Sequence, residues 1–361
     1  MINIKVDLGE NSYEIIIGHK SLSELGARLK SLGLGEDVVI ITNPVVRQLH
    51  GRALSASLKK GGFATKFFEV PDGEESKSAA QAFNLIEQIS SYNVKRQIFI
   101  LTFGGGVIGD LAGYVAAAYR RGVPYVQVPT PFLAQIDSAI GGKVAIDLPS
   151  GKNLVGAFYQ PRLVFSDVSL LSTLDQRQIR NWLAEVIKYG AICDRNFFEY
   201  VHHNMGKLLG LDAKALQEVV ANCSRIKARI VMKDEREIKG MRTILNFGHT
   251  IGHAIETANQ YKDYQHGEAV ALGMRVAAGL SVRLGFIGPN SAEKLNAVIT
   301  AAGLPERIKY VSLSDIMKYM EHDKKFSGKK NRFVLLTAIG SVKVAEGVDP
   351  KEIEAAIKDV M

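Results

Sequence analysis

The stretch QIFILTFGGGVIGD, residues 97–110, joins an apolar run to a cluster of four glycines. The run at 97–103 is rich in β-branched and aromatic residues, which predicts a buried strand. Gly104, Gly106 and Gly109 fit the spacing G-x-G-x-x-G, which lets a backbone approach a pyrophosphate at the start of a helix. The stretch therefore predicts a strand, a glycine loop and a helix that bind a dinucleotide, although a plain tight turn before a helix has the same pattern.

The same alternation of strand and helix runs through the first half of the chain. Buried strands are expected at 37–42, 65–70, 97–103 and 125–130, extended pieces at 143–147 and 162–167, and helices at 43–60, 78–91 and 107–119. Strands that alternate with helices predict a parallel, Rossmann-like sheet with helices on its faces.

From about residue 170 the apolar residues follow a helical period instead. A late pair of apolar runs, 331–340 and 341–347, is expected to form a small hairpin. The pattern therefore predicts two domains. An α/β domain that binds NAD would span 1–175, and a mainly α-helical domain that binds metal and substrate would span 176–361.

Composition limits the class of protein. Hydrophobic residues make up 47% of 361, enough for a sizeable core, and no run approaches the roughly 18 uncharged apolar residues of a membrane span. The N-terminus lacks the basic start and apolar block of a signal peptide, and the two cysteines have no paired spacing. We therefore expect a cytoplasmic protein without a membrane partner.

The net charge of +8 is compatible with nucleic acid, an anionic membrane surface, a small anionic substrate, or a basic surface with no partner. Dense clusters of lysine and arginine with interleaved aromatic residues are scarce, and 323–332 is the nearest candidate. A small anionic substrate is therefore favoured, and a nucleic-acid partner is not expected.

Two further polar segments lie in the first half of the chain. PDGEESKS, residues 71–78, follows a strand and offers carboxylates to a ribose, although an exposed acidic turn has the same composition. With the glycine loop it favours NAD. The stretch 135–153 places Asp137, Lys143 and Lys152 among glycines, where lysines suit a phosphate or a carboxylate. Surface lysines are the alternative interpretation.

The second half carries charged residues within apolar helical segments. Glu185 and Lys188 are such a pair, either ion-paired or coordinating. His249 and His253 are four residues apart and so share a helix face, but Thr250 breaks the HExxH pattern. With His266, one carboxylate and two imidazoles could form the open three-ligand site of a catalytic zinc. The residues alone leave the roles of His249 and His253 open. The two could be a metal pair, a metal ligand beside a catalytic group, or two buried ring side chains.

Several motifs together resemble those of the 3-dehydroquinate synthases, a family of the sugar-phosphate cyclase superfamily. They are GGGVIGD, IDSAIGGKVAIDLPSGKN, LAEVIKYG, LNFGHTIGHAIE and HGEAV, and the similarity runs from about residue 35 to 340. The resemblance implies a carbon–oxygen lyase that converts 3-deoxy-D-arabino-heptulosonate 7-phosphate to 3-dehydroquinate and phosphate, in the shikimate pathway to chorismate and aromatic amino acids. It also implies catalytic NAD, a zinc or cobalt ion and a homodimer.

The resemblance also implies roles for individual residues. Glu185, His249 and His266 match metal ligands, and His253 matches a histidine that contacts substrate and assists the chemistry. The other catalytic positions are Asp137, Lys143, Lys188, Arg242 and Asn246, and the substrate-binding positions are Arg121, which reaches a partner subunit, Lys152, Asn153, Lys227, Glu237 and Lys324. The cofactor positions are Asp72, Gly73, Glu74, Glu75, Ser76, Lys77, Gly105, Gly106, Val107, Ile108, Gly109, Asp110, Thr130, Pro131, Lys143, Lys152, Leu170, Leu171, Ser172 and Thr173.

The chain departs from the family pattern in three places. Pro131 replaces a common threonine, Asn43 stands where some members have an aspartate, and the segment before Arg242 is one residue longer. The rival functions are another sugar-phosphate cyclase, such as 2-deoxy-scyllo-inosose synthase, and a metal-dependent alcohol or glycerol dehydrogenase. Such a dehydrogenase would use an aspartate with histidines and lack the paired GGK and GKN segments. A nucleic-acid-binding protein, the third rival, would show salt-dependent retention on DNA.

Overall fold

The computed structural model describes residues 1–92, 97–260, 262–327 and 331–361, with the backbone alone at 321–327. The chain forms two compact units. The first comprises Met1–Thr173 and Leu216–Arg236, and the second comprises Leu174–Ala215 and Glu237–Met361. The segment 216–236, expected in the second domain, groups with the first unit. The stretch 135–153 lies within the first unit.

The first unit is built on a seven-stranded sheet with the order β1-β2-β9-β6-β5-β3-β4. All neighbouring pairs are parallel except β1 with β2. The strands are β1 (Ile2–Val6), β2 (Tyr13–Gly18), β3 (Asp37–Thr42), β4 (Ala64–Glu69), β5 (Ile98–Gly104), β6 (Tyr125–Pro129) and β9 (Leu163–Asp167). This sheet confirms the predicted parallel α/β fold.

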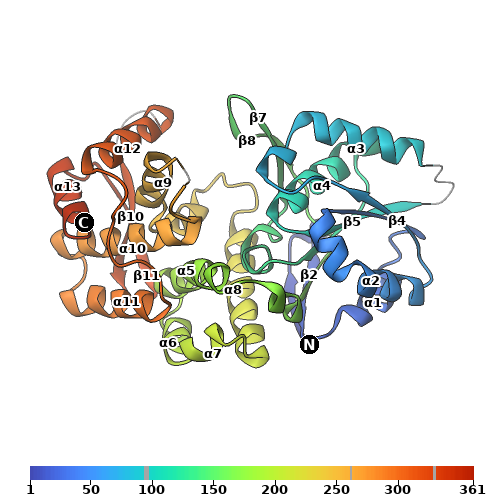
Figure 1. Cartoon of the computed structure of the whole chain (residues 1–361), viewed down its shortest axis with the longest axis horizontal. Coiled ribbons are helices and arrows are strands. Elements are labelled where there is room, and N and C mark those ends of the chain that lie inside the picture. The colour runs from blue at the N-terminus through green and yellow to red at the C-terminus, as the bar shows by residue number, and fades with distance from the viewer. Residues whose placement is uncertain (93–96, 261, 328–330) are drawn as a thin grey trace. The chain divides into compact units, whose positions relative to one another are not determined.

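Helices cover both faces of this sheet, with α1 and α2 on one side and α3 and α4 on the other (Figure 1). They are α1 (Leu25–Leu32), α2 (Pro44–Lys60), α3 (Ala79–Ser91) and α4 (Gly106–Ala118). Successive residues of a strand point to opposite faces, so Ile40 packs with α1 and α2 while Ile41 packs with α3 and α4. Strands covered on both faces are apolar throughout, which explains the continuous hydrophobic runs.

A two-stranded hairpin, β7 (Lys143–Leu148) with β8 (Gly151–Phe158), also belongs to the first unit. The sequence pattern predicted β7 but not β8. The segment of β8, GKNLVGAF, contains two glycines and a lysine, and most of its side chains are exposed. Its strand conformation comes from pairing with β7, which leaves no alternation of buried and exposed residues in the sequence to detect.

The second unit is mainly helical, as predicted, with one small hairpin, β10 (Arg332–Ala338) and β11 (Ser341–Glu346). Its central helix, α10 (His266–Arg283), buries most of its residues and packs against α5, α9, α11, α13 and β10. The other helices are α5 (Gln176–Cys193), α6 (Arg195–His203), α7 (Met205–Leu209), α9 (His249–Ala258), α11 (Pro289–Ala301), α12 (Leu313–Ser327) and α13 (Pro350–Lys358).

The long helix α8 (Ala213–Lys233) starts in the second unit and continues into the first. Among the described residues, no helix combines the length and the apolarity that crossing a membrane requires.

Candidate active site

The glycine loop lies at the point in the sheet where the chain stops adding strands on one side and begins to add them on the other. From β3 the chain proceeds to the edge strand β4, whereas from β5 it proceeds to β6 on the other side. The carboxyl ends of β3 and β5 are therefore a topological switch point, the usual position of a ligand in an open α/β sheet. This position explains why the glycine loop follows a later strand of the chain rather than the first.

The start of α4 can accept an anionic ligand. Gly105 caps the helix without a side chain, so the N–H groups of its first turn remain available to a phosphate. A Cβ at Gly105 would lie 3.3 Å from Pro131 Cγ, and one at Gly106 would lie 3.2 Å from Ser138 Oγ. A larger residue at either position would crowd the loop, and Pro131, which departs from the family pattern, lines it.

The acidic loop, residues 71–78, contacts both α4 and the β7–β8 hairpin through the side chain of Lys77. Its Nζ lies 2.5 Å from Asp110 Oδ2 and also donates to Asn153 Oδ1. Asn153 N donates to Asp147 Oδ1 at 2.7 Å. The lysine is buried, and burial raises the pKa of Asp110 to about 6 although the Lys77 charge lowers it. The buried Lys77 thus joins three segments distant in sequence, through an ion pair with Asp110 and a hydrogen bond to Asn153.

Other predicted cofactor positions surround the same edge of the sheet. Asn43, directly after β3, donates through Nδ2 to Asp72 Oδ1 at 2.8 Å. The Nζ atom of Lys152 lies 3.6 Å from Glu74 Oε1. Thr130 N donates to Gly104 O at 3.1 Å, next to the glycine loop. Gly73, Glu75 and Ser76 lie in the acidic loop, and Leu170, Leu171, Ser172 and Thr173 lie in the 3₁₀ turn Val168–Thr173.

Two predicted substrate contacts of the first unit form an ion pair. Lys227 Nζ on α8 lies 2.5 Å from Asp137 Oδ1, which belongs to a short π-helical turn at Ala134–Ser138. The exposed Lys143 begins β7. Arg121 ends the short 3₁₀ turn Tyr119–Arg121 with φ of 64°, and its side chain has no hydrogen bond or ion pair with the residues that the structure describes.

The second unit brings together the three predicted metal ligands. Glu185 and Lys188 lie on α5, His249 begins α9 and His266 begins α10. Both histidines turn Nε2 toward the same atom, Glu185 Oε1, at 3.5 Å from His249 and 3.8 Å from His266. The other carboxylate oxygen, Oε2, lies 2.5 Å from Lys188 Nζ.

This cluster fits a divalent cation. The three ligand atoms lie within 4.8 Å of one another. Ligand atoms on a tetrahedral zinc stand about 3.3 Å apart, because each lies about 2.0–2.1 Å from the ion. Among the side chains that the structure describes, three ligands converge here, which leaves the open position that a catalytic site needs.

The electrostatics of the two histidines differ. Burial and, next in size, the Lys188 charge lower the pKa of His249 to about 3, so this ring is neutral and can donate a lone pair at neutral pH. Burial also lowers the pKa of His266, but the hydrogen bond that His266 donates to Glu256 and the charges of Glu185 and Glu256 outweigh it, so the net shift is upward.

His253 lies on α9 one turn after His249 and is exposed. Its ring centroid is 5.2 Å from that of His249 and 6.0 Å from that of His266. His253, Glu256 and His266 also form a second group with ligand atoms within 4.8 Å. His253 therefore adjoins the cluster of Glu185, His249 and His266 without belonging to it.

The remaining predicted residues of the second unit lie before α9. Arg242 is buried in the 3₁₀ turn Met241–Asn246, and its Nη1 lies 3.7 Å from Glu237 Oε1. Asn246 ends that turn and is exposed. The side chain of Lys324 lies outside the described residues.

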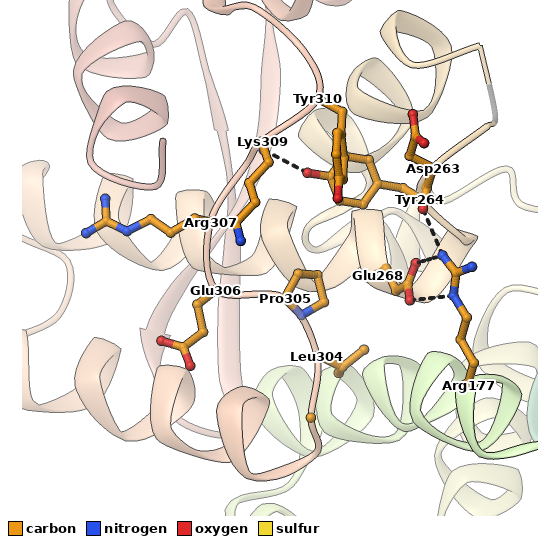
Figure 2. Close-up of a pocket in the computed structure, with 11 residues that line it drawn as sticks. Arg177, Asp263, Tyr264, Glu268, Leu304, Pro305, Glu306, Arg307, Lys309 and Tyr310 are labelled. Carbon is orange, nitrogen blue, oxygen red and sulfur yellow. Dashed lines mark hydrogen bonds and ion pairs between the residues drawn. The ribbon is translucent and has the colours of Figure 1, made fainter.

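Several residues that hold α10 against α5 were not predicted from the sequence. Asn181 Oδ1 accepts hydrogen bonds from the backbone N–H of Gly267 at 2.6 Å and of Glu268 at 3.3 Å. Arg177 donates twice to Glu268, at 3.0 and 2.8 Å, and once to Asp263 O at 2.8 Å, as Figure 2 shows. These bonds fix the end of α10 that carries His266 to the helix that carries Glu185.

Glu256 was also missed, although its spacing offered a signal. It follows His249 by seven residues and His253 by three, so all three lie on one face of α9. Arg177 and Glu268 also line a pocket of about 540 Å³ between Tyr264 and the segment 303–310, and none of the three metal-site residues Glu185, His249 and His266 lines it (Figure 2).

Comparison with known proteins identifies one family. Residues 67–181 match the family description 3-dehydroquinate synthase N-terminal, and residues 183–326 match 3-dehydroquinate synthase C-terminal. The chain is 44% identical over 358 residues to the 3-dehydroquinate synthase of Desulforamulus reducens, which covers 99% of each chain.

Solved structures share the fold. A 2-deoxy-scyllo-inosose synthase complexed with carbaglucose-6-phosphate, NAD⁺ and Co²⁺ matches with a TM-score of 0.90 and 26% identity over 100% of both chains. The glycerol dehydrogenase of Schizosaccharomyces pombe matches with a TM-score of 0.67 and 18% identity, over 96% of this chain and 88% of that one. The second similarity shows the fold alone.

Proposed function

This chain belongs to the 3-dehydroquinate synthase family, and we propose that it converts 3-deoxy-D-arabino-heptulosonate 7-phosphate to 3-dehydroquinate and phosphate. The reaction oxidises a secondary alcohol, eliminates phosphate from the neighbouring position, returns the hydride and closes a carbocycle by aldol addition. The observation that carries the proposal is the 44% identity over 99% of the chain, which includes every motif of the candidate site.

The chain's two units supply different parts of this chemistry. When bound, NAD accepts and returns a hydride, and a divalent cation polarises a substrate oxygen. The first-turn N–H groups of α4 would bind the pyrophosphate of NAD, and the segments joined by Lys77, Asp110 and Asn153 would border it. The positions at 72–77, 130–131 and 170–173 would complete the contacts.

In the second unit, Glu185, His249 and His266 would hold the cation, for which zinc and cobalt both suit the donor set. Lys188, whose Nζ lies 2.5 Å from Glu185 Oε2, would hold the Glu185 carboxylate in place and add a positive charge beside the reacting oxygen. His253 would hold and release a proton at its ring, because it lies beside the ligand cluster without completing it.

The substrate carries a phosphate and a carboxylate, and the cationic residues suit both. Arginine and lysine bind these groups through charge-assisted hydrogen bonds. Arg242, Lys143, Lys152, Lys227 and Lys324 would bind the anionic groups. Asp137, Asn153, Glu237 and Asn246 would orient the lysines, the arginine and the substrate hydroxyls.

We also propose a cytoplasmic homodimer that needs neither nucleic acid nor a membrane. Arg121 is exposed and has no hydrogen bond or ion pair among the described residues, which supports a role in the site of a partner subunit. Residues 1–175, with the returning segment 216–236, would form the NAD-binding domain, and the rest would bind metal and substrate.

A different sugar-phosphate cyclase is the second candidate, because a 2-deoxy-scyllo-inosose synthase shares the fold over the whole chain. One experiment separates the two functions. The protein is supplied with NAD, zinc and either heptulosonate phosphate or glucose 6-phosphate, and phosphate release is measured. We expect release from the heptulosonate alone. Release from glucose 6-phosphate alone would replace the proposal with the second candidate.

A further inference from the structure

The two ring nitrogens of His266 face two different carboxylates, both within the second unit. Its Nε2 lies 3.8 Å from Glu185 Oε1, the proposed metal ligand. Its Nδ1 lies 3.2 and 3.4 Å from the two oxygens of Glu256, which is on α9. His266 thus lies between Glu185 and a second acid, Glu256, which has no role in the proposed function.

Glu256 is 7% exposed, and its neighbours on α9, Ile255 and Ala254, are buried apolar residues. A buried carboxylate is costly unless it is paired and hydrogen-bonded. Within the part of the chain whose side chains the structure describes, every hydrogen bond of the Glu256 carboxylate goes to His266. The contact with His266 therefore accounts for the position of this acid.

A neutral imidazole has one N–H group and one lone pair, and a hydrogen bond at one nitrogen decides where each lies. His249 uses the carbonyl of Phe247, 3.2 Å from its Nδ1, so its Nε2 lone pair can face Glu185. At His266 a carboxylate stands in the same place, which fixes the tautomer and also raises the basicity of the ring.

We propose that Glu256 is a positioning residue that holds the Nδ1–H of His266 and thereby aims its Nε2 lone pair at the metal. This inference rests on the proposed function, because it assumes that an ion binds at Glu185, His249 and His266. The alternative is a second ion bound by His253, Glu256 and Nδ1 of His266, since these ligand atoms also lie within 4.8 Å of one another. The two arrangements exclude each other, because an ion at Nδ1 would displace the proton that Glu256 accepts.

The test measures metal binding by the full-length protein rather than its activity. Wild-type protein is stripped with a chelator and titrated with zinc and with cobalt, beside Glu256→Ala and Glu256→Gln. We expect one ion per chain in all three. Loss of the acceptor should weaken binding about 10- to 100-fold in Glu256→Ala. Glu256→Gln keeps a carbonyl acceptor, so it should bind less tightly than wild type but more tightly than Glu256→Ala.

Glu199→Gln is the matched control, because Glu199 is an ion-paired acid of the same unit whose partner, Lys294, lies outside the metal cluster. Its metal affinity should equal that of the wild type. Circular dichroism and thermal unfolding without metal separate a folding defect from a binding defect. If Glu256→Ala does not fold, the comparison of Glu256→Gln with Glu199→Gln decides the question: weaker binding supports the proposal and equal binding overturns it.

The other outcomes are distinct. A folded Glu256→Ala protein with wild-type affinity would overturn the proposal. Two ions in the wild type, with loss of one and retention of the other in Glu256→Ala, would overturn it in favour of a bridging His266. A wild type that binds no ion would overturn the metal site of the proposed function itself, and with it this inference.

Discussion

Gly267→Ala tests how closely helices α5 and α10 must approach to form the metal cluster. A Cβ at Gly267 would lie 1.7 Å from the carbonyl oxygen of Asn181, whereas ordinary contact begins at 3.4 Å. The start of α10, which carries His266, would therefore move by about 1.7 Å. Metal ligands tolerate deviations of about 0.2 Å, so the displaced ring could bind the ion only by moving back against this clash.

The cost of that clash sets the expected loss of affinity. Overpacking a well-packed site costs about 1–3 kcal/mol, which corresponds to a metal affinity lower by about 5- to 140-fold. Gly279→Ala is the control on the same helix, since nothing lies within 4 Å of a Cβ there, and it should stabilise the helix by up to about 1 kcal/mol. Zinc titration measures the metal affinity of both variants. A folded Gly267→Ala protein with the affinity of the Gly279→Ala protein would refute the reasoning.

Three further predictions concern other parts of the site. His253→Ala should retain its metal but lose turnover by about 100- to 10,000-fold, as phosphate release and elemental analysis would show, and a metal-free variant would instead make it a ligand. Because the pKa of Asp110 is raised from 3.8 to about 6, its protonated form contributes stability at low pH that is lost as pH rises to about 6. Asp110→Asn should remove up to about 3 kcal/mol of this pH dependence from the free energy of unfolding measured in urea, and an unchanged profile would contradict the raised pKa. Mixed Arg121→Ala and Lys188→Ala proteins should recover part of the activity through hybrid dimers, unless Arg121 serves its own subunit.

The sheet and its helices could be predicted because their signals are local. The central strands β3 and β5 are buried along their whole length and mostly apolar, and α2 begins where Asn43 caps its backbone and Pro44 follows. β8 could not be predicted, because a hairpin strand of exposed and glycine residues owes its conformation to its partner rather than to its own composition. The grouping of 216–236 with the first unit likewise depends on packing rather than on helical period.

The candidate site likewise has a part that could be predicted from the sequence and a part that could not. The chemistry of Glu185, His249 and His266 is visible as residue types, and the family resemblance implied their common role before their Nε2 and Oε1 atoms were located. The supporting contacts are not visible in this way. Asn181 reaches Gly267 across 86 residues, and Lys77 reaches Asn153 across 76, so no sequence window contains either pair. The sequence therefore predicts the candidate reacting groups but not the residues that hold them in place.

The central claim is that the chain uses NAD as a catalyst in a reaction without net oxidation. The most direct measurement follows phosphate and NADH together, with heptulosonate phosphate in large excess over NAD. The account predicts many phosphates released for each NAD, with no accumulation of NADH. NADH that accumulates in proportion to product would contradict it and would favour a metal-dependent dehydrogenase.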